Sequence, residues 1–135
     1  MRDTNRSVPF TISLVESITL IAPNIAAALL MLLGGAALLF PKTMAAFVGI
    51  QPVAPVGVSE IRSTLGSFFL GLGATCLWLQ SADAFTVLGV ASLGAATVRL
   101  LSSVFDRSAS IKNIGGVVAE ALLGVLFLLS WGWSA

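Results

Sequence analysis

The strongest constraint in this chain is a set of long apolar stretches that carry almost no charge. They are residues 17–40, 63–82, 84–105 and 113–135. Only Arg99 and Glu120 interrupt them. Each is about 20 residues long, and a helix of that length covers the ~30 Å hydrocarbon core of a bilayer. Strands with open edges would leave backbone groups unpaired in lipid, so helices are required. The sequence predicts an all-α integral membrane protein, a bundle of four transmembrane helices.

The expected domain organisation follows from the placement of these stretches. We expect residues 1–16 to form a tail or interfacial segment and residues 17–135 to form one domain. Its spans are expected at about 20–40, 60–82, 84–105 and 113–133. Pro23 allows two readings of the first span: a helix that begins at Pro23, or a longer helix kinked there. We favour the first, with residues 10–22 at the interface, because Glu16 is costly deep in lipid.

The N-terminus also invites comparison with a signal peptide. Arg2 and Arg6 precede an apolar stretch, but Glu16 interrupts it and no small-residue cleavage site follows. The sequence therefore disfavours cleavage.

Composition excludes several classes of protein. Only 10% of the residues are charged, whereas a soluble domain needs about 25%. Histidine is absent and Cys76 is the single cysteine, so we expect no metal site, no dithiol chemistry and no cofactor held covalently or through histidine. The composition does not exclude a bound lipophilic ligand. No basic tract is present, so nucleic acid is not an expected partner.

The connections between the spans differ in length. Residues 41–59 form the longest one, and its apolar middle, Met44 to Ile50, predicts a short helix in the headgroup zone closed by Gly49. The second connection, around Asp83, is short enough to predict a tight antiparallel hairpin of the second and third helices. The third connection, residues 106–112, is short and polar.

The charged residues near the spans converge on one half of the bundle. With four spans, the first and third connections lie on the same face of the membrane. Glu60 and Arg62 open the second helix at that face, and Arg99 and Glu120 lie about two turns inside it. We predict an Arg99–Glu120 ion pair with Glu60 and Arg62 near its mouth. The cluster is either a polar clasp that fixes helix register or a site for a lipophilic molecule with a polar head.

Small residues predict where the helices approach one another. Gly116, Glu120 and Gly124 recur at spacing four, and Ser67 and Gly71 lie on a similar stripe of the second helix. Such stripes allow close helix contact in membranes. We therefore expect Ser67, Gly71, Gly116 and Gly124 to be packing positions.

Two further patterns concern the membrane faces. The three tryptophans, Trp78, Trp131 and Trp133, fall at the opposite face and predict an interfacial aromatic belt. The connections on the charged face carry Lys42, Arg107 and Lys112, against Arg2 and Arg6 on the other face. The positive-inside rule then places both termini outside, by a margin of one residue.

An ordered set of residues gives the chain a resemblance to a known family. They are Pro41, Gly49-Ile50, Glu60-Ile61-Arg62, Gly66, Gly71-x-Gly73, Arg99 and Glu120. In this order they resemble small bacterial four-helix membrane proteins classed as a domain of unknown function, DoxX-like in appearance. Leu65 and Gly66-Ser67 stand where that family tends to have an aromatic residue and a glycine pair. The resemblance implies a multi-pass protein of the bacterial inner membrane, and DoxX-like relatives point toward quinone-dependent oxidation.

Three functions compete at this point. The first is a non-enzymatic accessory or structural subunit of a larger membrane assembly, since no nucleophile–base set is present. As partners we expect membrane lipids and either a larger membrane complex or a homo-oligomer. The second is a binder or enzyme for a quinone, isoprenoid or lipid, with Glu60 and Glu120 as acid–base groups and Arg62 and Arg99 as head-group ligands. The third is a small multidrug-type transporter, disfavoured because Glu16 lies outside the expected span. The sequence leans toward the first and leaves catalysis open.

Overall fold

The computed structural model describes the backbone of residues 10–133 and the side chains of residues 14–132. Every regular element in this range is helical. In chain order the elements are α1 (Phe10–Leu39), α2 (Pro41–Val48), α3 (Pro55–Glu60), the π-helical segment η1 (Ile61–Ser67), α4 (Phe68–Leu79), α5 (Ala82–Phe105), α6 (Ile111–Leu128) and the 3₁₀ segment η2 (Leu129–Trp133). The prediction of an all-α protein is confirmed.

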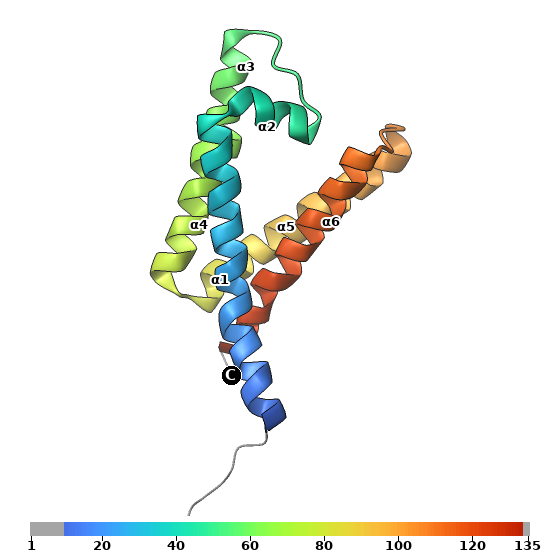
Figure 1. The fold of residues 1–135 in the computed structure, drawn as a ribbon. Coiled ribbons are helices and arrows are strands. Elements are labelled where there is room, and N and C mark those ends of the chain that lie inside the picture. The colour runs from blue at the N-terminus through green and yellow to red at the C-terminus, as the bar shows by residue number, and fades with distance from the viewer. Residues whose placement is uncertain (1–9, 134–135) are drawn as a thin grey trace, which may run out of the picture.

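The helices form two pairs that meet at one end and diverge at the other (Figure 1). One pair is α1 with the η1–α4 run, and the other is α5 with α6. The pairs touch where η2 and the end of α6 pack against α1, and α2 lies across the open end. The predicted four-helix bundle is therefore not confirmed, since the two pairs splay apart from a shared base.

Three helices in the described range are long and apolar enough to span a membrane. They are Leu14–Leu39 within α1, Ala82–Phe105, and Ile111–Gly132 across α6 and η2. The chain is accordingly a multi-pass membrane protein. The expected second span is built differently: the helical run from Pro55 to Leu79 is interrupted by η1, and α4 alone has 12 residues. Hydroxyl groups explain the interruption, because Ser63 and Thr64 both donate to the Glu60 carbonyl oxygen, at 3.1 and 2.6 Å, and compete with the helical ladder.

The start of α1 corrects one expectation. The helix does not begin at Pro23 but runs unbroken from Phe10, with Pro23 inside it and fully buried. Residues 10–16, expected in the tail, belong to the same helix, and Glu16 lies two residues inside the span that begins at Leu14. Proline is tolerated here because η2 packs against this part of α1 and neighbouring helices support the weakened ladder. Arg2 and Arg6 lie outside the described residues.

The core lies at the base, where the two pairs meet. Its buried residues are Ala26, Ala27, Leu30, Cys76, Phe85, Leu88 and Phe127. The rings of Phe85 and Phe127 stack with their centroids 6.1 Å apart, which joins the start of α5 to the end of α6. Ala26 and Ala27 of α1 are fully buried in the same cluster as these rings. The base is thus the part of the molecule that fixes the angle between the two pairs.

Glycines let the helices of each pair approach closely. A Cβ on Gly34 of α1 would meet the backbone of Leu70, and a Cβ on Gly124 of α6 would lie 3.1 Å from the Gly89 carbonyl oxygen of α5. Backbones this close leave no room for a side chain. These small residues therefore allow α1 to pair with α4, and α5 to pair with α6.

The connections were predicted in part. The short helix α2 is confirmed, and Gly49 closes it with a left-handed backbone (φ +85°). The Ile50 and Gly49 amides donate to the carbonyl oxygens of Ala45 and Ala46, at 2.8 and 3.3 Å, which is a Schellman arrangement. The turn between α4 and α5 is short, as expected, but these two helices diverge instead of packing as a hairpin.

Candidate functional site

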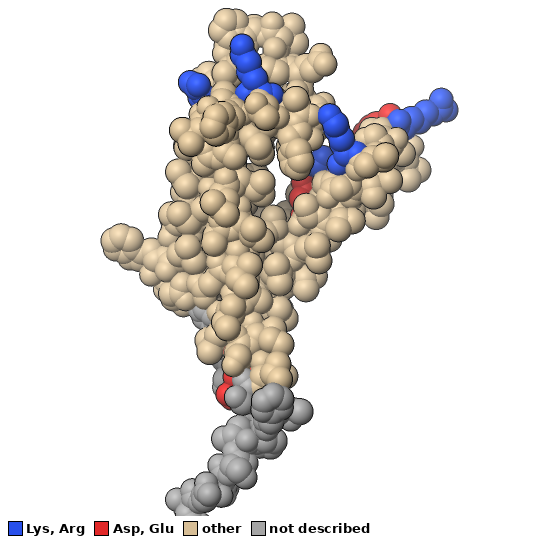
Figure 2. All heavy atoms as spheres, in the orientation of Figure 1, with Lys and Arg blue, Asp and Glu red and all other residues tan. Residues whose placement is uncertain are grey.

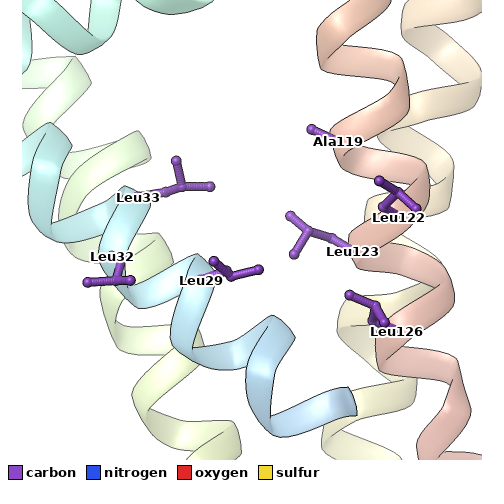
Figure 3. Close-up of a pocket in the computed structure, with 7 residues that line it drawn as sticks. All are labelled: Leu29, Leu32, Leu33, Ala119, Leu122, Leu123 and Leu126. Atoms are coloured by element: carbon purple, nitrogen blue, oxygen red, sulfur yellow. The ribbon is translucent and has the colours of Figure 1, made fainter.

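An apolar groove of about 440 Å³ lies between α1 and α6, on the inner side of the splayed pairs. Its lining consists of Leu29, Leu32, Leu33, Ala119, Leu122, Leu123 and Leu126. In Figure 3, Leu29 and Leu33 point across the gap toward Leu123. The spacing i, i+3, i+4 on each helix places these side chains on one stripe. A leucine-lined groove of this kind suits a hydrocarbon chain.

The structure brings Arg99 and Glu120 together beside this groove. Arg99 Nε donates to Glu120 Oε2 at 3.0 Å and Arg99 Nη2 to Oε1 at 2.7 Å, a two-pronged ion pair between α5 and α6. Their side chains are 33% and 24% exposed, so a small molecule can reach both. Figure 2 shows red and blue atoms at the inner edge of the α5–α6 pair, beside the gap. The ion pair is therefore partly exposed.

Asn113 extends this pair into a network that the sequence analysis missed. Its Oδ1 accepts from Arg99 Nη1 at 3.3 Å, and its Nδ2 donates to Ser103 Oγ at 2.8 Å and Ser108 Oγ at 3.2 Å. Ser103 in turn donates to the Arg99 carbonyl oxygen at 2.9 Å. A signal was available: Asn113 precedes Glu120 by seven residues, and Ser103 follows Arg99 by four, so each lies on the face of its helix that carries the ion pair.

Gly116 makes room for the Arg99 side chain. A Cβ at this position would lie 2.8 Å from Arg99 Nε and 2.9 Å from Arg99 Cδ. The neighbouring Gly115 has nothing within 4 Å of such a Cβ. Gly116 therefore serves the guanidinium of Arg99, in addition to the predicted approach of two helices.

The other predicted packing positions are placed unequally. Gly124 is buried against Leu93 and the Gly89 backbone. Gly71 is exposed, and a Cβ there would meet nothing within 4 Å. Ser67 is exposed as well, and its hydroxyl donates to the Ser63 carbonyl oxygen at 3.0 Å, within its own helix. Gly71 therefore has open space where a close approach of helices was expected, and the Ser67 hydroxyl is used within its own helix.

Glu60 and Arg62 are not joined to the ion pair. Both are exposed on the other helix pair, at the junction of α3 and η1, which packs against α1 and α2. Arg99–Glu120 is the one ion pair found among the described residues. The predicted four-residue cluster is thus divided between the two sides of the open end, because the pairs splay apart.

A second polar contact crosses the open end. Lys112, at the start of α6, donates from Nζ to the Ala46 carbonyl oxygen of α2 at 2.8 Å. An ammonium group is favourable there because the last carbonyl oxygens of a helix carry partial negative charge. This contact is consistent with the predicted placement of the first and third connections at one end. It ties α2 to α6 above the groove.

The tryptophans lie at the base, opposite this end. Trp78 of α4 is 87% exposed and Trp131 of η2 is 68% exposed. The side chain of Trp133 lies outside the described residues. Exposed indole rings at one end fit the predicted interfacial belt.

Comparison with known proteins bears on the family but on no activity. A family described as a domain of unknown function, DUF4345, matches residues 18–131. No curated protein and no solved structure matches the chain. The match runs from α1 to η2 and includes both the groove and the ion pair. The chain therefore belongs to the DUF4345 family of unknown function.

Proposed function

We propose that this protein binds a lipophilic molecule with a polar head inside the membrane, in the groove between α1 and α6. The observation that carries the proposal is the position of the groove beside the polar network. Ala119 lines the groove, and the next residue, Glu120, holds Arg99. Apolar walls with a few convergent polar groups are the usual composition of a ligand site.

The network retains hydrogen-bonding capacity for such a head. Arg99 carries five N–H donors, of which three are used by Glu120 and Asn113. A carboxylate can accept about four hydrogen bonds, and Glu120 receives two from Arg99. A head group with a carbonyl or hydroxyl can therefore bind while the ion pair stays intact. This supports the site reading of the Arg99–Glu120 pair over a purely structural clasp.

Photolabelling tests the groove directly. The full-length protein in nanodiscs receives phosphatidylcholine with a diazirine on its acyl chain, and the labelled peptides are mapped by mass spectrometry. We expect labelling to concentrate on residues 29–33 and 119–126. Ala119→Trp fills the groove and should reduce that labelling at least threefold, whereas Ala91→Trp, on an exposed position of α5, should not. Uniform labelling around α1 and α6 would contradict the proposal.

A second candidate is the accessory or structural subunit, and low internal burial favours it. Only 33%, 22% and 17% of the residues in the apolar windows of the three spans are buried within the chain. The remaining faces must be covered by lipid or by another protein, since α5 packs mainly against α6, and α6 mainly against α5 and α1. A larger membrane assembly or a homo-oligomer would cover them.

Mild-detergent purification separates this candidate from the first. A stoichiometric partner protein would support it, whereas a homo-oligomer without such a partner would count against it. A monodisperse monomer in several mild detergents and in nanodiscs would remove it. The groove proposal does not depend on that result.

The setting that we propose is the bacterial inner membrane. The resemblance to DoxX-like proteins supports it and keeps a quinone among the possible ligands. We further propose that the run Pro55–Leu79 crosses the bilayer as a fourth span, since it has no helix end at η1. Basic residues at the splayed end then place both termini outside.

A further inference from the structure

Lysine side chains lie at the open end of the groove and make this end positively charged. Lys112 is exposed and lies seven residues before Ala119 on α6, two turns along the same face and roughly 10 Å away. A molecule that lies in the groove along α6 therefore reaches Lys112 with its end. The groove wall and the lysine belong to one continuous strip of the molecule.

Lys112 has donors to spare at this point. Its ammonium group carries three N–H donors, and one is used by the Ala46 carbonyl oxygen. That contact fixes the side chain above the groove, between α2 and α6. Lys42 is exposed on the same short helix α2, one turn before Ala46. Two lysines, one on α2 and one on α6, thus lie at the open end.

The charge balance of the whole end points the same way. The described basic side chains there are Lys42, Arg62, Arg99, Arg107 and Lys112, against the acidic Glu60, Asp106 and Glu120. Arg99 and Glu120 neutralise each other. Figure 2 shows blue side chains on both sides of the open end. The described residues at the base contribute only the acidic Glu16 and Asp83. The end above the groove is therefore net positive.

We infer that the groove ligand is an anionic phospholipid, held by its acyl chain between α1 and α6, by an ester carbonyl at the Arg99–Glu120 network and by its phosphate head at Lys112. This inference rests on the proposed function and names the ligand of that site. A strip with a leucine-lined lower part and a cationic upper part matches the two parts of such a lipid. Basic pockets between membrane helices bind anionic lipid head groups, and one lysine near a membrane surface contributes about 1 kcal/mol of attraction to anionic lipid. That energy corresponds to a preference of about fivefold.

Two photoactivatable lipids test the assignment. Phosphatidylglycerol and phosphatidylcholine, each with the same acyl-chain diazirine, are added at equal mole fraction to nanodiscs that hold the full-length protein. We expect phosphatidylglycerol to label residues 119–126 about fivefold more than phosphatidylcholine. Lys112→Gln keeps a donor for the Ala46 carbonyl oxygen and removes the charge, so the ratio should fall toward one. Lys112→Arg should restore it.

The test has a matched control variant and two negative outcomes, each of which contradicts a different claim. Arg107→Gln removes a charge from the α5–α6 turn, off the strip, and should leave the ratio unchanged. Equal labelling by both lipids, or a ratio that Lys112→Gln does not alter, would overturn the head-group assignment and leave the groove as a binding site. If neither lipid labels the groove more strongly than it labels the outer face of α5, the proposed function is overturned, and with it this inference.

Discussion

At the scale of single residues, the Arg99–Glu120 pair is the most determined feature of the molecule. Arg99 is held by two oxygens of Glu120, by the amide oxygen of Asn113 and by the space left at Gly116. Glu120, Asn113 and Gly116 lie on the face of α6 that is turned toward Arg99 of α5, so the network depends on the register of α5 against α6. The pair therefore reports on that register.

Removing both charges of the pair should cost less than the sum of the costs of removing each one. Arg99→Met or Glu120→Met leaves a lone charge in a low-dielectric setting, whereas the double variant leaves none. Because both side chains are partly exposed, we expect each single change to destabilise by about 1–3 kcal/mol, and the double variant by less than the sum. Thermal unfolding in one detergent measures all four proteins. Additive losses would show that the two charges do not interact.

Two adjacent glycines provide a sharper test of the same network. Gly116→Ala places a Cβ against the end of the Arg99 side chain, which must shift and strain its two-pronged contact with Glu120 and its bond to Asn113; overpacking of this kind costs about 1–3 kcal/mol. Gly115→Ala meets open space and should be neutral or stabilising by up to about 1 kcal/mol, because alanine favours the helix. The difference in melting temperature between the two variants is the measurement. Equal effects would argue against a fitted site for Arg99.

At the scale of elements, the two helix pairs are held by small residues and not by interlocking large ones. Gly34 faces the Leu70 backbone, and Gly89 faces Gly124. Without a hydrophobic force between helices in lipid, close backbone approach is the main source of association. The splayed shape follows, since each pair has its own small-residue contact and the two pairs share only the base.

The α1–α4 pair should respond to one glycine and not to its neighbour. Gly34→Ala drives a Cβ into the Leu70 backbone, which cannot rotate away, so we expect a loss of at least about 2 kcal/mol or a separated pair. Gly35→Ala has nothing within 4 Å and should be tolerated. The unfolding temperature and the protease accessibility of the connection at residues 49–54 measure the difference. Intact protection in the Gly34→Ala protein would contradict the contact.

These elements also show how far local pattern determines the structure. The helix closed by Gly49 and the spans around Arg99 and Glu120 depend on local pattern and length, and those patterns are explicit in the chain. The position of Glu60 and Arg62 depends on the angle between helix pairs, which the core around Phe85 and Phe127 sets. Pro23 departs from the sequence-based expectation for a similar reason, because its support from η2 comes from the other end of the chain.

At the scale of the whole molecule, topology connects the groove to the membrane. If the run Pro55–Leu79 crosses the bilayer, the connections at residues 49–54 and 106–110 share one face, and the turn at residues 80–81 lies on the other. The contact of Lys112 with α2 is consistent with this arrangement. If that run does not cross, the first connection and the α4–α5 turn share a face.

Single cysteines decide between these topologies. In a Cys76→Ala background, the exposed positions Gln51, Asp83 and Ala109 are changed to cysteine one at a time and treated in intact cells with a maleimide that cannot cross membranes. Four spans with both termini outside predict that Asp83→Cys is labelled and that Gln51→Cys and Ala109→Cys react only after the cells are opened. Equal reactivity of Gln51→Cys and Asp83→Cys would show that α4 does not cross. The reverse pattern, with Gln51→Cys and Ala109→Cys labelled first, would keep four spans but turn the basic end outward, where the lysines at the groove would face the outer leaflet.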